Sequence, residues 1–392
     1  MKRKSISALF LATVYWLFAS PVAWAESKEL TYRTARQVQI AYELQLKEKP
    51  DEAITVLANL NPSGQYDFAY VNRMLGGLYW QTQQPLLAIK TLTLAIEQKA
   101  LPAVQHQDTQ RMLADILLME GQYKLAEFHY QKLLPAYEQA DDLEWLWLRI
   151  AQAQYQQQEW ARVELSIGHQ QRYRQQAKLP LKVMPLNMLL GAQLARKKWQ
   201  NAVPTALSLR ILEPDNYVWW RQLITLYIYT QQQQQALITL QQADRVGFEL
   251  SDQYLMLMAQ LYAQDGVPKK AAQTYARLKG LDNSATLRAK QAEYWQAAKE
   301  WDKAASIWLK AAQIDNKFYW QHALLLLKMR DHERALISID KLTNQTSQML
   351  LAKTQALSAI GQKEQALQVA TKLHRIESSE ESLRWIKYLS ED

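Results

Sequence analysis

A repeat of about 35 residues runs through this chain, and it restricts the possible folds more than any other feature. Ten small residues recur at separations of 31 to 39: Ala53, Ala88, Ala126, Val163, Ala202, Ala236, Ala271, Ala304, Ala335 and Ala366. We call these ten residues the seeds of the repeat. Positions at a fixed distance from the seeds, which were not used to choose them, also agree between copies. The residue four later is apolar in all ten copies, and the residue nine earlier is large and apolar in eight. The sequence therefore indicates ten copies of one structural unit.

Each unit is predicted to be two helices joined by a tight turn. Apolar residues four and seven positions after the seed share one helix face with it, and residues nine and thirteen before it share a face of the preceding helix. Gly121, Gly266 and Gly361 each stand five before a seed, where a left-handed residue ends a helix. Pro50, Pro85 and Pro268 each stand three before a seed, where the first turn of the second helix tolerates proline. Neither helix can bury its apolar face alone, so the hairpins must stack.

Copies four and five fit the pattern least well. Gln154, Gln170 and Gln193 occupy apolar columns, and Pro204 falls inside the second helix of copy five. Residues 171–182 form an insertion that we interpret as either a loop or a local kink.

Composition supports long helices with few breaks. The 392 residues include only 10 glycines and 11 prolines, which disfavours an all-β chain with frequent turns. The absence of cysteine excludes disulfide frameworks, thiolate zinc sites and thiol-dependent enzymes. A formal charge of +8 is too small a basic excess to indicate nucleic-acid binding.

The repeat resembles the tetratricopeptide repeat (TPR). The copy that matches best, with its seed at Ala236, carries Trp220, Leu223, Ile224 and Tyr227 on the first helix, then Ala236, Leu240 and Ala243 on the second. The resemblance implies an all-α, right-handed solenoid of about ten antiparallel helix hairpins over residues 26–377. A C-terminal capping helix and tail are predicted over residues 378–392, with a capping box formed by Ser378 and Glu381. Apolar residues on that helix are expected to cover the last hairpin: Leu383, Trp385, Ile386, Tyr388 and Leu389.

Residues 1–25 have the pattern of a secretory signal peptide. Three basic residues precede an apolar stretch and an Ala-Trp-Ala cleavage pattern, so we predict cleavage after Ala25. The alternative is an uncleaved membrane anchor, but a helix of about 14 apolar residues is shorter than the hydrocarbon core of a membrane. The expected location is the periplasm, with at most a peripheral association with the membrane.

No catalytic or metal-binding motif is present in the sequence. The six histidines lack the spacing of a ligand pair on one helix face, and the glycine-rich and nucleophile motifs are missing. We therefore expect no cofactor, no bound metal and no enzymatic activity.

A solenoid of this kind binds its partners on the first helices of its hairpins, according to the resemblance. Side chains that lie outside the packing columns of these helices are the candidate protein-binding residues, with aromatic and arginine side chains favoured as anchors. They are Tyr70, Arg73, Trp80, Arg111, Asp115, Trp145, Leu148, Gln152, Tyr155, Asn187, Arg221, Thr225, Tyr229, Met256, Gln260 and Trp320. The alternative for the tryptophans, including Trp147, Trp219 and Trp220, is packing between hairpins. The lysine and asparagine arrangement with which some relatives clamp a terminal carboxylate is not reproduced.

The chain also resembles the periplasmic TPR proteins associated with TonB-type energy-transduction systems of gamma-proteobacteria. The resemblance rests on residues 75–81, 110–115, 146–151 and 219–223. It implies a scaffold that couples an inner-membrane motor to outer-membrane nutrient receptors, with TonB-complex components or those receptors as partners. The alternative is an assembly factor for envelope polysaccharide, pilus or outer-membrane protein biogenesis.

Overall fold

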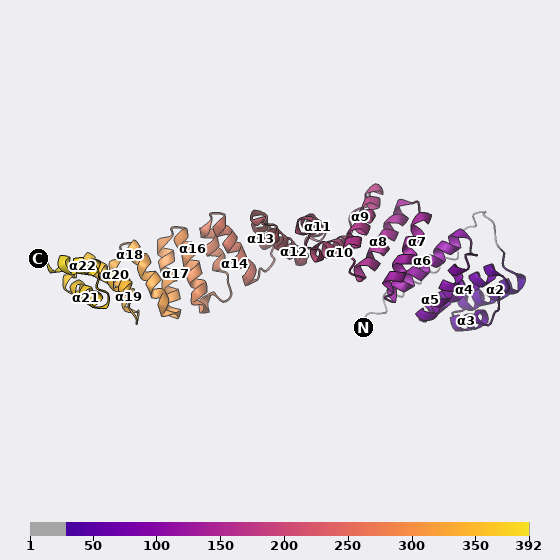
Figure 1. The fold of residues 1–392 in the computed structure, drawn as a ribbon, viewed down its shortest axis with the longest axis horizontal. Coiled ribbons are helices and arrows are strands. Elements are labelled where there is room, and N and C mark those ends of the chain that lie inside the picture. Colours follow the sequence, from indigo (N-terminus) through magenta and orange to yellow (C-terminus); the bar gives the residue numbers. More distant parts are fainter. Residues whose placement is uncertain (1–28, 392) are drawn as a thin grey trace. The chain divides into compact units, whose positions relative to one another are not determined.

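The computed structural model describes residues 29–391 and divides the chain into two compact units. Unit 1 ends at Leu212 and unit 2 begins at Glu213. The predicted signal peptide lies outside the described residues. Throughout residues 29–391 the regular secondary structure is helical (Figure 1).

The described part of unit 1, from residue 29 to Leu212, contains five helix hairpins. Their helices are α2 (Tyr32–Leu46) and α3 (Pro50–Ala58), α4 (Gln65–Gln81) and α5 (Pro85–Glu97), α6 (Ala103–Met119) and α7 (Tyr123–Leu133), α8 (Ala140–Gln156) and α9 (Trp160–Gln176), and α10 (Val183–Ala195) and α11 (Trp199–Leu212). A short 3-10 helix, η1 (Leu134–Ala136), follows α7. Each helix packs against the next one along the chain.

Unit 2 contains five further hairpins and one final helix. They are α12 (Tyr217–Tyr229) and α13 (Gln233–Arg245), α14 (Asp252–Gln264) and α15 (Pro268–Tyr275), α16 (Ala285–Ala297) and α17 (Trp301–Ile314), α18 (Tyr319–Lys328) and α19 (His332–Asp340), α20 (Ser347–Ala359) and α21 (Lys363–Ile376), and then α22 (Glu380–Ser390). The short helices η2 (Leu281–Asn283) and η3 (Asn316–Phe318) lie in the connections. The prediction of an all-α fold with ten hairpins and a capping helix is confirmed.

The turn inside every hairpin has one conformation. The residue five before the seed has a positive φ in all ten copies, and only Gly121, Gly266 and Gly361 are glycines. In each copy the next residue's N–H donates to the carbonyl nine before the seed, over 2.8 to 3.0 Å. This is the hydrogen bond that closes a helix ending in a left-handed residue. Every second helix then begins three residues before its seed.

The seed residues occupy the contact between the two helices of each hairpin. All ten are 0% exposed, and the residues four after them are buried as well. A larger side chain at a seed would meet the facing helix at once, which explains why alanine recurs there.

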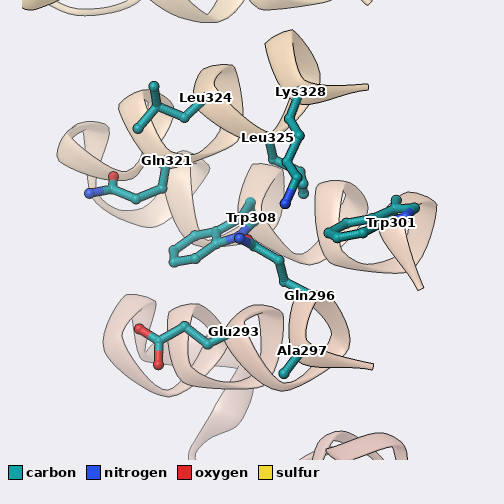
Figure 2. A pocket seen from close by; sticks show the side chains of 9 residues that line it. All are labelled: Glu293, Gln296, Ala297, Trp301, Trp308, Gln321, Leu324, Leu325 and Lys328. Atoms are coloured by element: carbon teal, nitrogen blue, oxygen red, sulfur yellow. The ribbon is translucent and has the colours of Figure 1, made fainter. Parts of the chain in front are cut away.

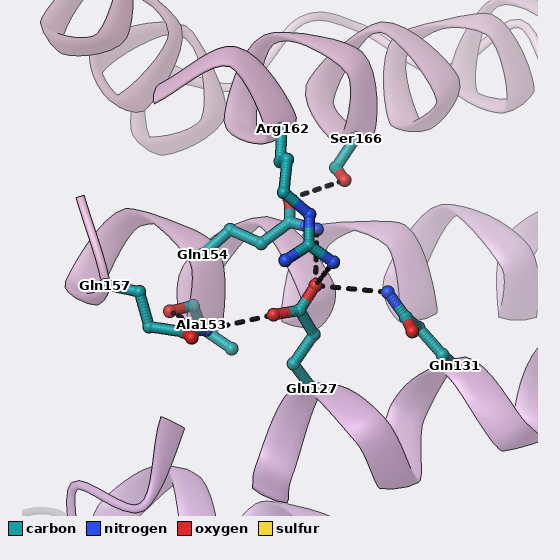
Figure 3. Close-up of polar contacts among 7 residues, drawn as sticks. All are labelled: Glu127, Gln131, Ala153, Gln154, Gln157, Arg162 and Ser166. Atoms are coloured by element: carbon teal, nitrogen blue, oxygen red, sulfur yellow. Dashed lines mark hydrogen bonds and ion pairs between the residues drawn. The ribbon is translucent and has the colours of Figure 1, made fainter. Parts of the chain in front are cut away.

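The glutamines that break the apolar columns of copy four belong to buried polar networks between helices. Glu127 of α7 accepts hydrogen bonds from Gln154 Nε2 at 2.7 Å, from Gln157 Nε2 at 3.0 Å and from Arg162 (Figure 3). Gln154 in turn accepts a hydrogen bond from Ser166 Oγ at 2.7 Å. These contacts join α7, α8 and α9, so the polar residues serve the packing that apolar residues serve in the other copies.

The second network explains the insertion after copy four. Gln170 Nε2 and Arg174 Nη1 both donate to the buried Glu144 carboxylate of α8, the arginine at 2.8 Å. Arg174 Nε also donates to the carbonyl of Pro180. Helix α9 therefore extends to Gln176, and the rest of the insertion is a short connection tethered by Arg174.

The capping helix forms as predicted, but two details of the prediction are wrong. The capping box joins Ser379 and Ser382, since each backbone N–H reaches the other's hydroxyl at 3.2 Å. Ser378 lies one residue outside the cap because the whole box is shifted by one residue: Ser379 is the N-cap, and its N–H donates to Ser382 Oγ. Trp385, Ile386 and Leu389 pack on the last hairpin, whereas Leu383 and Tyr388 are more than half exposed on the other side of the helix.

Candidate protein-binding site

Predicted binding residues of α6 and α8 come together in unit 1 with residues that the sequence had not marked. We call Arg111, Asp115, Tyr130, Trp145 and Arg149 the arginine–tryptophan cluster. Arg111 Cζ lies 3.9 Å from the centroid of the Trp145 ring, and Arg149 Cζ lies 5.4 Å from it. Tyr130 of α7 meets the same ring edge to face at 6.0 Å. Two guanidinium groups therefore share one indole ring, an arrangement that cation–π attraction stabilises.

Asp115 forms the floor of this cluster. Its carboxylate accepts the hydroxyl hydrogen bond of Tyr130 and lies 3.8 Å from Arg149 Nε. The side chain of Asp115 is 14% exposed against 31% for Arg149, so the acid lies beneath the guanidinium. Burial raises the pKa of Asp115, and burial together with the negative charge of Asp115 raises the pKa of Tyr130.

The charges continue from the cluster towards α4. Asp108, on α6, interacts with Arg111 on its own helix and with Arg73 of α4. Burial raises the pKa of Asp108, and the two arginines oppose that rise. Arg111 also interacts with the hydroxyl of Tyr137, whose pKa is raised by burial. Tyr70 stands beside Tyr66 on α4, with ring centroids 6.0 Å apart.

The remaining unit 1 candidates divide between surface and packing positions. Gln152 extends the cluster, because its Oε1 accepts from Arg149 Nη1 at 3.1 Å and its Nε2 lies 3.7 Å from Met184 Sδ of α10. Tyr155 instead packs edge to face on Trp160, and Trp80 packs against the core of the neighbouring hairpins.

Three tryptophans follow the packing interpretation. Trp147 stacks on His169 with ring centroids 4.3 Å apart. Trp219 and Trp220 are buried, and their indole N–H groups donate to Glu213 at 2.7 Å and to the Pro214 carbonyl at 2.8 Å.

The unit 2 candidates lie on α12 and α14, except Trp320 of α18, which packs against the core cluster that includes Ala323. Arg221, Thr225, Tyr229 and Gln260 are exposed, and Met256 is half-buried. The Thr225 hydroxyl donates to the Arg221 carbonyl at 2.9 Å.

A pocket of about 560 Å³ in unit 2 was not predicted from the sequence. It opens between α16 and α18 over the Trp308 ring of α17 (Figure 2). Gln296 Oε1 accepts the Trp308 indole N–H at 3.2 Å, and Lys328 Nζ lies 4.6 Å from the Trp301 ring centroid. Glu293 stands at the same place in copy eight as Asp115 in copy three, so extending the register to this copy would have marked one of the residues that line the pocket.

Among residues 29–391, no group of three or more histidine or acidic side chains is arranged to hold a metal ion. Over the same residues, no helix has the length and apolar character needed to cross a membrane. The buried His322 and the half-buried His374 contact serines between helices, at 2.9 and 2.8 Å.

Comparison with known proteins finds similar helical-repeat structures at low identity. No family model and no curated protein matches the chain. A tetratricopeptide repeat protein from Parabacteroides merdae is 18% identical, with 63% of this chain and 99% of that chain covered and a TM-score of 0.31. The C-terminal part of a TPR repeat-containing protein from Cytophaga hutchinsonii is 16% identical, with 71% and 95% covered and a TM-score of 0.38.

A third solved structure is YrrB, described as a TPR protein with an unusual peptide-binding site. It is 14% identical, with 47% of this chain and 92% of that chain covered and a TM-score of 0.33. Likenesses at this level transfer no function to the present chain.

Proposed function

We propose that this protein is a non-catalytic scaffold that binds other polypeptides on the first helices of unit 1. The observation that carries the proposal is the arginine–tryptophan cluster. Its guanidinium groups are held in place by the Trp145 ring and by Asp115, yet Arg149 remains partly open to solvent. Arginine and tryptophan dominate the binding energy of many protein interfaces, most of all where they are already ordered before binding.

We further propose a periplasmic role as an accessory of a TonB-type energy-transduction system. The signal-like residues 1–25 and the sequence resemblance of residues 75–81, 110–115, 146–151 and 219–223 support this proposal. An assembly factor for the cell envelope is the second candidate, since the same signal-like segment and the same binding surface would serve it equally.

Site-specific photo-crosslinking in cells tests both levels of the proposal. A photoreactive residue at Gln152 of α8 or Asn187 of α10 should capture a partner protein, whereas one at the exposed Leu165 of α9 should not. Equal capture at all three positions, or none at any, contradicts binding by the first helices. Mass spectrometry of the captured protein then decides the finer role. TonB-complex components support the accessory role, and polysaccharide or pilus machinery alone contradicts it.

A further inference from the structure

The arginine–tryptophan cluster carries an excess of one positive charge. Arg111 and Arg149 both lie against Trp145, and the Asp115 carboxylate lies 3.8 Å from Arg149 Nε and interacts electrostatically with Arg111. The nearest acid along α6 is Asp108, which is shared with Arg73 of α4. The two guanidinium groups on one ring repel each other, and the single charge of Asp115 offsets this repulsion only in part. A carboxylate from a partner would offset the rest.

The acids and the bases lie at different depths. Asp115 is directed inward to the Tyr130 hydroxyl, and its side chain is less than half as exposed as that of Arg149. A molecule that approaches this face therefore meets guanidinium N–H groups first. Arg111 Cζ lies 3.9 Å from the Trp145 ring centroid, and this contact restrains a guanidinium group that can donate two parallel hydrogen bonds to one carboxylate.

The three arginines come from three successive first helices. Arg73 is on α4, Arg111 on α6 and Arg149 on α8. Arg111 Cζ and Arg149 Cζ lie 3.9 Å and 5.4 Å from the same ring centroid, so the two guanidinium groups are at most about 9 Å apart. An extended polypeptide advances about 3.3 Å per residue, so carboxylates up to three residues apart can reach both groups.

From this geometry we propose that the arginine–tryptophan cluster, together with Arg73, binds an extended acidic segment of a partner protein with acidic residues at every third position. The partner's carboxylates lie on the guanidinium groups, and the apolar residues between them lie on Trp145 and Tyr70. This inference rests on the proposed scaffold function, because it names the chemistry of the partner at the same surface.

Peptide binding to the full chain tests the proposal. The probe is a fluorescein-labelled peptide of four Asp-Leu-Ser repeats, measured by fluorescence anisotropy. Its two controls have asparagine in place of every aspartate, or the same composition with the four aspartates adjacent. We expect the spaced acidic peptide to bind most tightly, and its affinity to fall as sodium chloride rises from 50 to 500 mM, as an interaction between exposed charges requires.

Variants locate the binding. Arg111→Gln and Arg149→Gln should each weaken the acidic peptide about tenfold, the loss expected from one charge-assisted hydrogen-bonded pair. Arg172→Gln is the matched control, because it removes the same charge from an exposed position on α9 of the same unit. Circular dichroism and thermal unfolding establish that each variant is folded. The salt titration of the parent chain gives an answer even where a variant fails to fold.

Three results would overturn the inference. They are equal binding of the asparagine peptide, wild-type affinity in both cluster variants, and equally tight binding of a dodecathymidine strand through the same arginines, which would define a general anion site. The two proposals can fail independently. Crosslinking at Gln152 to a partner that lacks an acidic segment would support the scaffold function and overturn the proposed binding of an acidic segment.

Discussion

Seven residues other than glycine adopt a left-handed backbone conformation at the turn of a hairpin. They have φ between 55° and 63° and are Glu48, Gln83, Gln158, Lys197, Gln231, Lys299 and Arg330. This conformation costs a residue with a Cβ about 1 to 2 kcal/mol, while glycine adopts it without that cost. The turn is therefore a place where the sequence has not been optimised for stability.

We expect Lys299→Gly to stabilise unit 2. The gain should be about 0.5 to 1 kcal/mol, because the relief of left-handed strain exceeds the extra entropy that glycine loses on folding. Lys299 is exposed, so no buried contact is lost. The measurement is the urea midpoint of unfolding.

The matched control is Gly266→Ala, at the equivalent turn of the preceding hairpin, where φ is +77°. It should destabilise the protein by about 1 kcal/mol. A change of the same sign in both variants would show that strain does not decide stability at this turn.

His322 makes unit 2 sensitive to acid. It lies buried on α18 with Nδ1 2.9 Å from Ser338 Oγ, and that hydroxyl donates to the Arg334 carbonyl at 3.1 Å. We therefore assign the ring proton to Nδ1, with Ser338 as its acceptor. Burial, and then the positive charge of Arg334, lower the pKa of His322 to about 4, although Asp331 opposes the change.

A lowered histidine pKa means that the unfolded chain takes up its proton first as the pH falls. Stability that is fully present above pH 6.5 is then lost progressively down to about pH 4. We expect a loss of about 2 kcal/mol between pH 7.5 and pH 5 from this group. The His322→Gln variant should be less sensitive to acid by that amount in urea unfolding at the two pH values. An unchanged difference between the two pH values would assign the acid sensitivity to other groups.

At the scale of the helices, the sequence predicted the turn inside each hairpin because the residues around that turn keep a fixed spacing from the seed. The fixed distance between the left-handed residue, the helix start and the seed reflects one hydrogen-bonded turn repeated ten times. The sequence did not reveal the polar networks of copy four. Their glutamines read as misfits in apolar columns, since their partners Glu127 and Glu144 lie far away in the sequence and only the packed helices bring them together.

Glu127→Ala should destabilise unit 1 by about 3 kcal/mol. The change leaves the buried amide of Gln154 and the guanidinium of Arg162 without their carboxylate, and breaking a buried charged network by removing one partner is costly. The control is Glu52→Ala in the same unit, whose ion pair with Lys49 is more than half exposed. It should cost at most about 0.5 kcal/mol. Equal effects would mean that the Glu127 network contributes no more than a surface pair.

Ala236→Lys tests whether the seed residue lies at the contact between the two helices of a hairpin. Ala236 is 0% exposed between α12 and α13, so a long charged side chain there should cost well over the ~1 kcal/mol of an average substitution. Gln234→Lys, exposed two residues earlier on the same helix, is the control. Similar thermal unfolding of the two variants would contradict the assignment of the seed to the contact between helices.

At the scale of the whole molecule, stacked hairpins contact only their neighbours, so damage should stay local. Ending the chain after Ser378 removes α22 and uncovers the cluster that includes Leu357 and Ala370. We expect amide hydrogen exchange to accelerate in α20 and α21 and to stay unchanged in unit 1. The Tyr388→Ser variant, which alters an exposed residue of α22, should leave all of these amides protected. Loss of protection throughout both units would contradict a local cap.

The binding surface could be predicted only in part. The register placed Arg111, Asp115 and Trp145 on first helices; in the structure Arg111 contacts the Trp145 ring and interacts electrostatically with Asp115. Arg149 was missed because it stands one position after Leu148, the residue of copy four that corresponds to Arg111. Tyr130 was missed because it belongs to a second helix. Which side chains of neighbouring helices meet depends on their rotamers, and a period in the sequence does not encode these.

The invariant hairpin turn has a consequence for how such a chain can change in length. Spacing between seeds varies from 31 to 39 residues, yet the stretch from nine before a seed to the seed itself keeps its ten-residue geometry in every copy. Differences in length therefore lie outside this stretch, in the outer ends of the helices and in the connections from one hairpin to the next. A gene encoding this architecture can gain, lose or duplicate whole hairpins in frame, because each hairpin contains the complete turn that joins its two helices.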